Sequence, residues 1–131
     1  MTRSMTRWML AGCMALGAVG ALAQADLPAN PFAGSWSGTW SHEDVIGTWD
    51  DWTISDAGVI SGTYYSITNN FGGKIVGHVS ADGEIMFNGV GGGSGNPHQG
   101  TAWIDSNGDI VVAVTGTWSG AWSLVGILKR T

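Results

Sequence analysis

The sequence predicts an all-β protein, an eight-stranded antiparallel up-and-down β-barrel, and three observations lead to it. From Gly34 to the C-terminus, apolar and polar residues alternate with the period of two that is typical of strands, without helical spacing. Turn signals interrupt this alternation at regular intervals. A meander of eight short strands leaves two unpaired edges unless it closes, and eight strands close around side chains or one small ligand.

Clusters that contain glycine, asparagine or aspartate mark the turns. They are Asp56-Ala57-Gly58, Asn69 to Gly73, Ala81-Asp82-Gly83, the Gly91 to Pro97 stretch and Ser106-Asn107-Gly108. We expect strands near residues 34–42, 47–55, 59–67, 73–80, 84–90, 98–105, 109–118 and 121–129. A sandwich of two four-stranded sheets has the same turns and stays open as an alternative.

A near-repeat favours closure of the sheet. Residues 36–41 read WSGTWS, and residues 118–123 read WSGAWS. The two copies fall on the first and last predicted strands, which are neighbours in a closed meander. Resemblance between any two aromatic, glycine-rich strands is the alternative explanation.

The first 25 residues have the organisation of a cleavable export signal. Arg3 and Arg7 stand at the start without an acid, and residues 8–22 carry no charge. Ala23-Gln24-Ala25 then offers small residues at the positions that a signal peptidase reads. We expect cleavage after Ala25, which leaves a secreted or periplasmic domain over residues 26–131.

A lipoprotein signal is the competing interpretation. Leu10-Ala11-Gly12-Cys13 has the residue types of a lipoprotein cleavage box, with Cys13 as the lipid-bearing residue. Only two residues separate this box from Arg7, so almost no apolar segment would precede the cut. The spacing therefore favours the site after Ala25.

Composition restricts the partners of the predicted domain. It carries three basic residues against ten acidic ones, a net charge of about −7, so nucleic acid and anionic membranes are poor partners. The apolar run over residues 8–22 is shorter than the roughly 20 residues of a membrane-spanning helix. Cys13 is the single cysteine and lies in the signal, so the domain must fold without a disulfide. Whether the domain forms a homo-oligomer stays open.

The period of two brings aromatic and polar residues onto shared strand faces. The shared faces hold Trp40 and His42; Thr48, Asp50, Trp52 and Ile54; Tyr64 and Ser66; Thr101 and Trp103; Val112, Val114 and Trp118; and Trp122, Leu124 and Leu128. Each buried hydroxyl group needs a hydrogen-bond partner. This mixture is therefore more typical of a ligand cavity than of a purely structural core.

The order of these motifs resembles the avidin and streptavidin family over nearly the whole predicted domain. The similar segments are Gly38-Thr39-Trp40 with His42 and Gly47-Thr48; residues 62–66 (GTYYS) with Asn70; residues 96–103 (NPHQGTAW); Trp118; and residues 123–126 (SLVG). None of these motifs is specific alone, but their ordered spacing is more so. The resemblance implies biotin, or a biotin-like small molecule, bound in the mouth of the barrel.

Carried over by position, the resemblance assigns a role to nine residues. It implies His42, Thr48 and Tyr64 around the ureido oxygen, Ser66 at a ureido nitrogen, Thr101 at the thiophene sulfur, Asn70 and Gln99 at the carboxylate end, and Trp103 and Trp118 as apolar walls. The family's aspartate on the last strand corresponds to Leu128, and Phe87 is the nearest aromatic to its wall tryptophan on the fifth strand. These departures predict weaker binding than in the family.

Other function classes have weaker support in the sequence. Asp50 and Asp51 with Glu84 are the only candidate catalytic acids, and no nucleophile motif accompanies them, so we expect no enzyme. The run His42-Glu43-Asp44 alternates between strand faces, so we expect no metal site and no cofactor. A carbohydrate-binding module with exposed tryptophan platforms and a structural or interaction barrel remain the alternatives. The orientation of the tryptophans distinguishes these possibilities.

We predict that the exported protein begins at Asp26 and carries no lipid. Intact-mass spectrometry of the protein from its native host checks both points, because cleavage after Ala25 fixes the expected mass. An acylated Cys13 at the N-terminus would show that the lipoprotein interpretation is correct.

Overall fold

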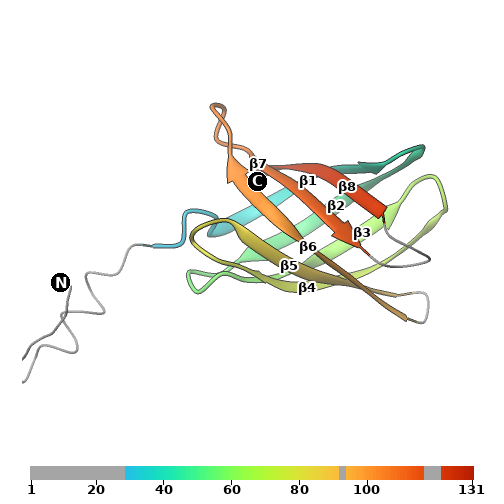
Figure 1. The fold of residues 1–131 in the computed structure, drawn as a ribbon, viewed down its shortest axis with the longest axis horizontal. Helices are drawn as coiled ribbons and strands as arrows, with labels where there is room; N and C mark the ends of the chain where they lie inside the picture. Colours follow the sequence, from blue (N-terminus) through green and yellow to red (C-terminus); the bar gives the residue numbers. More distant parts are fainter. Residues whose placement is uncertain (1–28, 92–93, 117–121) are drawn as a thin grey trace, which may run out of the picture.

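The computed structural model describes residues 29–91, 94–116 and 122–131, which form one closed antiparallel β-barrel (Figure 1). Its strands are β1 (Gly34–His42), β2 (Val45–Ile54), β3 (Val59–Ser66), β4 (Phe71–Val79), β5 (Glu84–Gly91), β6 (Ser94–Ile104), β7 (Ile110–Gly116) and β8 (Trp122–Arg130). Each strand pairs with the next, and β1 also pairs with β8, with Trp36 opposite Arg130. The predicted barrel is confirmed, and the sandwich is not formed. No helix that could span a membrane occurs in these ranges.

The observed strands begin and end within two residues of the predicted limits, with one exception. Strand β6 begins at Ser94, inside the Gly91 to Pro97 stretch that was predicted to be a turn. There the strand pairs with β5 as far as Ser94 opposite Gly91. Pairing along a closed sheet overrides the weak strand preference of glycine, asparagine and proline.

Three turns of the same kind lie at one end of the barrel. They span Ser55–Val59, Ser80–Glu84 and Asp105–Asp109, and in each the first and fifth residues are hydrogen-bonded through the backbone. The fourth residue of each turn is a glycine whose φ lies between 83° and 91°. Glycine adopts this left-handed conformation without steric cost, which makes the turn a favoured hairpin connection. We call this end of the barrel the closed end.

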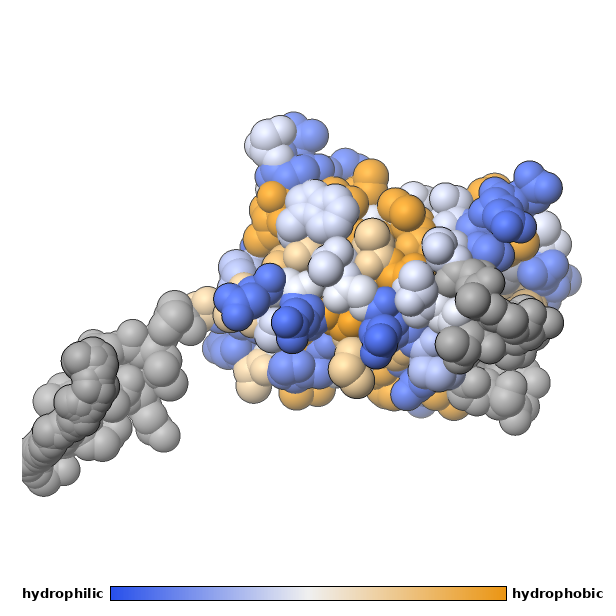
Figure 2. All heavy atoms as spheres, in the orientation of Figure 1, coloured by the Kyte–Doolittle hydropathy of each residue, from blue (hydrophilic) through white to orange (hydrophobic). Residues whose placement is uncertain are grey.

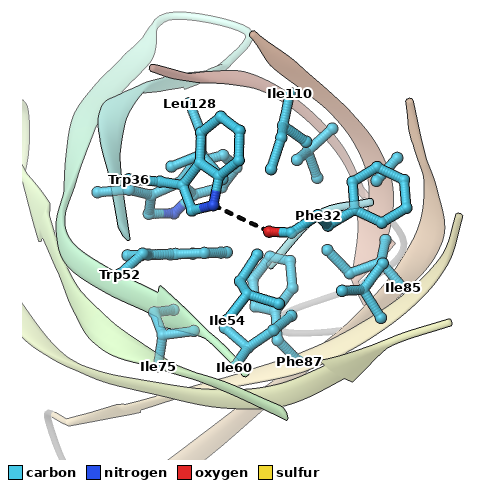
Figure 3. Packing of buried hydrophobic residues seen from close by; sticks show 14 of the residues in the cluster. Phe32, Trp36, Trp52, Ile54, Ile60, Ile75, Ile85, Phe87, Ile110 and Leu128 are labelled. Carbon is cyan, nitrogen blue, oxygen red and sulfur yellow. Dashed lines mark hydrogen bonds between the residues drawn. The ribbon is translucent and has the colours of Figure 1, made fainter. Parts of the chain in front are cut away.

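The segment before β1 closes this end. Phe32 inserts its ring between the strands and is 4% exposed, and the indole N–H of Trp36 donates to the Phe32 carbonyl oxygen at 2.9 Å (Figure 3). The Asn30 side chain accepts from the Phe32 N–H at 2.9 Å and donates to the Val79 carbonyl oxygen at 3.0 Å. Buried polar groups in the plug are thus paired, as a stable core requires.

Branched aliphatic side chains fill the barrel around this plug. They include Ile54, Ile60, Val79, Ile85, Ile110, Val112 and Leu128, all with exposed fractions of 4% or less (Figure 3). Burying each of these side chains against Phe32 and its neighbours stabilises the fold by about 1.5–3 kcal/mol. This core compensates for the lack of a disulfide in residues 26–131.

Aromatic rings fill the middle of the barrel. Trp49 and Trp52 have centroids 4.9 Å apart, and Phe87 meets them edge-on at 5.9 and 5.6 Å. These large rings fit only where the residues opposite them on neighbouring strands have no side chain. A Cβ atom at Gly126 would lie 2.3 Å from the Trp49 ring, and one at Gly47 would lie 2.2 Å from the Trp40 ring. The glycines on the inner face therefore accommodate the indole groups.

We predict that Leu128→Asp destabilises the protein severely. Leu128 is fully buried, and its cross-strand partners are Gly38 and Ile110 at the closed end. Leu128 belongs to a cluster of buried hydrophobic side chains, so a carboxyl group there would lose its hydration. The expected loss of unfolding free energy is about 3 kcal/mol or more. Urea unfolding followed by tryptophan fluorescence measures the loss, with Leu128→Met as the volume-matched control. Equal stability of the aspartate variant would show that Leu128 is not a core residue.

Candidate functional site

The inner face of the barrel changes character from one end to the other. At the closed end it is aliphatic, whereas the opposite end, beside the β1–β2 turn and the β3–β4 loop, brings polar and aromatic side chains inward. We call this group the mouth; it consists of His42, Val45, Ser66 and Phe71 at the rim, with Trp40 and Tyr64 one step deeper. Cross-strand register joins its members, because Ser66 pairs with Gly47 and Phe71, and Gly47 pairs with Trp40.

Ser66 is the most buried polar side chain of the mouth. It is 1% exposed at the end of β3, and its hydroxyl oxygen accepts from the Asn69 N–H at 3.2 Å. The Ser66 carbonyl oxygen also accepts from the Asn70 N–H at 2.8 Å. These two bonds fix the β3–β4 loop over the serine, so the position of its hydroxyl group is set by the backbone.

Tyr64 and Phe71 form an aromatic corner beside this serine. Their ring centroids lie 6.2 Å apart and their planes are nearly perpendicular, at 89°. The Tyr64 ring also extends across β4 toward β5, where a Cβ atom at Gly89 would lie 3.2 Å from it. Phe71 keeps 40% of its surface exposed. An inward-facing but exposed ring at a barrel rim is apolar surface that a bound molecule can cover.

Partial burial has an electrostatic effect on Tyr64. Desolvation raises the pKa of its phenol above the ordinary value of 10.0, because the charged phenolate loses hydration. Tyr64 is therefore a neutral hydrogen-bond donor and acceptor at physiological pH.

His42 connects the mouth to the last strand. It lies at the end of β1, and its Nδ1 atom is 2.6 Å from the Ser123 carbonyl oxygen on β8. Because a carbonyl oxygen can only accept, a neutral ring bonded in this way carries its proton on Nδ1. His42 therefore belongs to the mouth, as predicted, and is held by the β1–β8 closure.

Thr48 faces the outside of the barrel, which corrects the prediction that it shares an inner face with Trp52. A bulge in β2 shifts the register between Asp50 and Thr53, and Asp51 has a positive φ of 54°. Before the bulge Trp49 points inward, and after it Trp52 does. The Thr48 hydroxyl instead donates to the Asp50 carboxylate at 2.8 Å.

Thr101 and Trp103 share one face, as predicted, but it is the outer face of β6. The inner face of β6 carries His98, Gly100 and Ala102. His98 stacks on Phe87 with centroids 4.9 Å apart, so the space next to β6 is already filled. Trp103 is 47% exposed and cannot form a wall of the mouth.

Two further predicted residues do not join the mouth, and a third lies outside the residues that the structure describes. Asn70 is exposed in the β3–β4 loop, with a φ of 56°, and its side-chain oxygen accepts from the Tyr65 hydroxyl. Gln99 is exposed on the outer face of β6. Trp118 lies outside the described residues. Of the nine predicted residues, His42, Tyr64 and Ser66 therefore come together.

Sequence reasoning missed two residues of the rim. Phe71 lies in the cluster from Asn69 to Gly73, whose glycine and asparagine content predicts a turn. Strand β4 in fact begins at Phe71, and the period of two from buried Ile75 places Phe71 on the inner face. Val45 was missed for the same reason, since β2 begins two residues before its predicted start.

The carboxylates and histidines of the described residues do not assemble a metal site, since no group of three or more potential ligands occurs among them. Asp50, Asp51 and Glu84 are all exposed on the outer wall, the first two on β2 and the third on β5. The chemistry that the mouth offers is thus hydrogen bonding by hydroxyl and imidazole groups beside aromatic rings.

The chain matches no protein-family model, no curated protein and no solved structure. The mouth must therefore be interpreted from its own residues.

We predict that Tyr64 titrates above pH 10. In a Tyr65→Phe variant, Tyr64 is the one tyrosine left, so the phenolate absorbance reports it alone. Because the raised pKa belongs to the folded state, its contribution to stability is complete below pH 10 and is lost as the pH rises through the folded-state pKa. A titration midpoint at or below 10 would contradict the partial burial of the ring.

Proposed function

We propose that this protein is a non-enzymatic binding protein that holds one small molecule in the mouth of the barrel. The observation that carries the proposal is the contrast between the two ends: aliphatic residues and the Phe32 plug fill one end, and His42, Ser66 and Tyr64 converge at the other. A barrel end that is filled only by side-chain packing has no need of inward hydroxyl or imidazole groups. A ligand site needs a few convergent polar groups beside apolar walls.

Biotin, or a molecule with a similar small polar head, is the first ligand to test. The three residues that converge are three of the four that the avidin resemblance assigns to the ureido group, the fourth being Thr48. Tyr64 can donate to an oxygen, Ser66 can accept from a nitrogen, and Phe71, which is 40% exposed, offers apolar surface for the rest of the molecule. These groups support a neutral polar head, because the Tyr64 phenol and the Ser66 hydroxyl form hydrogen bonds without carrying a charge.

The expected affinity is modest. Five of the residues that the resemblance assigned to the ligand do not join the mouth, so their contacts are missing; they are Thr48, Asn70, Gln99, Thr101 and Trp103. Leu128 lies in the core at the closed end, so it is not a position from which an acceptor could reach the ligand. At about 1.4 kcal/mol per tenfold change, losing several hydrogen bonds weakens binding by orders of magnitude relative to a complete site.

We predict that biotin quenches or shifts tryptophan fluorescence and that Tyr64→Phe and Ser66→Ala each weaken binding about threefold to tenfold, the effect of one hydrogen bond. Isothermal titration calorimetry measures the dissociation constants. Thr63→Ala is the matched control, because Thr63 is the neighbour of Tyr64 on β3 but faces outward. Equal losses in the control and in Tyr64→Phe would contradict the mouth as the site. Absence of heat with biotin, desthiobiotin and free ureido compounds would contradict the proposed ligand class.

A further inference from the structure

The outer wall of strands β4 to β8 carries a second arrangement that the mouth does not use. His78, Met86, Gln99, Thr115 and Ser123 are successive cross-strand partners in one row. Side chains in such a row lie on the same face of the sheet. At about 4.8 Å per strand, the row is roughly 19 Å long. We call it the polar row, since four of its five side chains form hydrogen bonds readily.

Grooves lie on both sides of the polar row. One has a volume of about 450 Å³ and extends toward Val76, Asn88 and Pro97. The other has a volume of about 580 Å³ and extends toward Glu84, Ala113 and Val125. Met86, Gln99 and Thr115 line both, so the grooves adjoin along the polar row. The small side chain of Ala113 leaves the hollow in the second groove.

An apolar stripe runs parallel to the polar row, nearer the closed end. It consists of the cross-strand partners Trp103, Val111 and Ile127, of which Trp103 is 47% and Ile127 40% exposed. Trp40, Trp36, Trp49 and Trp52 are by contrast at most 7% exposed. Figure 2 shows apolar side chains gathered over the upper strands on this side of the barrel, with polar ones below. The wall is therefore amphipathic, and among its described side chains Trp103 places an indole at the surface.

The charge of this wall restricts what can occupy it. Glu84 is the one residue with a formal charge among those that line the two grooves. The whole chain carries a net charge of −5, so an anionic polymer would be repelled. The remaining polar side chains are amides, hydroxyls and an imidazole, which both donate and accept hydrogen bonds. Such groups complement a partner whose own groups also both donate and accept hydrogen bonds.

We propose that the outer wall of β4 to β8 binds a neutral carbohydrate chain. Sugar hydroxyls both donate and accept, which matches Asn88, Gln99 and Thr115, and the carbon faces of a pyranose ring pack on an indole such as Trp103. The exposed indole of Trp103 and the groove along the polar row form the site. This site is separate from the mouth and does not depend on the small ligand proposed there.

Affinity electrophoresis tests the site with named polymers: hydroxyethyl cellulose, xylan, glucomannan and soluble starch, with polygalacturonate as the anionic comparison. We expect at least one neutral polymer to retard the wild-type protein and polygalacturonate not to. Gln99→Ala and Trp103→Ala should each weaken retardation by about fivefold. Ser61→Ala is the control, because Ser61 is exposed on the β3 wall, where its hydroxyl pairs with that of Thr53.

Three outcomes would overturn the proposal. The first is that none of the four neutral polymers retards the protein. The second is that Ser61→Ala weakens retardation as much as Gln99→Ala does. The third is a dimer in sedimentation velocity that Trp103→Ala dissociates, because a second copy of the chain would then cover the wall. Circular dichroism spectra that match the wild type ensure that each variant is folded.

Discussion

The pairing of β1 with β8 is the constraint on which the rest of the structure depends. It turns a meander with two exposed edges into a ring in which every strand has two neighbours. Once the ring is closed, the interior has a fixed width, and each inward side chain must fit beside those of seven other strands. It also fixes the mouth, because His42 on β1 is bonded to Ser123 on β8.

Aromatic rings fit this narrow interior because glycines lie opposite them. Trp40 pairs with Gly47, and Phe87 pairs with Gly77. Each large ring therefore lies opposite a residue that has no side chain. Large-to-small alternation packs an interior densely without strain. The glycines at these inward positions are therefore a packing requirement of the barrel.

The fold was predictable because its signals are local and repeated. Three glycine-containing turns recur at the closed end, and the period of two defines the strands between them. Which face points inward was predictable where the alternation is unbroken, as for Tyr64 and Ser66 in β3. It was not predictable for Thr48, because the β2 bulge reverses the faces within one strand, and a bulge has no clear signature in Asp50-Asp51. For Thr101 and Trp103 the pairing on one face was right, but the choice between inside and outside depends on how Phe87 and His98 fill the barrel.

The resemblance-based site failed in the residues whose orientation depends on packing across the barrel. Of the residues that it grouped, the structure brings together His42, Tyr64 and Ser66, which lie at or near strand ends on one side of the ring. It could not identify Phe71, since the extent of β4 is decided by pairing with β3 and not by the turn propensity of Asn69 to Gly73. A motif in sequence order fixes which residues are near the mouth, whereas register decides which of them point into it.

The two walls of the barrel differ in the length of their exposed side chains and in the apolar surface beside them, although both carry polar groups that are already paired, such as the Thr115 hydroxyl with the Gln99 carbonyl oxygen at 3.5 Å. On β2 and β3, the hydroxyls of Thr53 and Ser61 bond each other at 2.9 Å, and Thr63 donates to the Asp50 carbonyl oxygen at 3.0 Å. Short side chains that bond within the wall gain little from a partner, because binding would only exchange one hydrogen bond for another. On β5 and β6 the exposed side chains are longer, and Met86 and Trp103 add apolar surface that water solvates poorly. A partner that covers apolar surface while it hydrogen-bonds to amides therefore gains more free energy on the β4 to β8 wall than on the other.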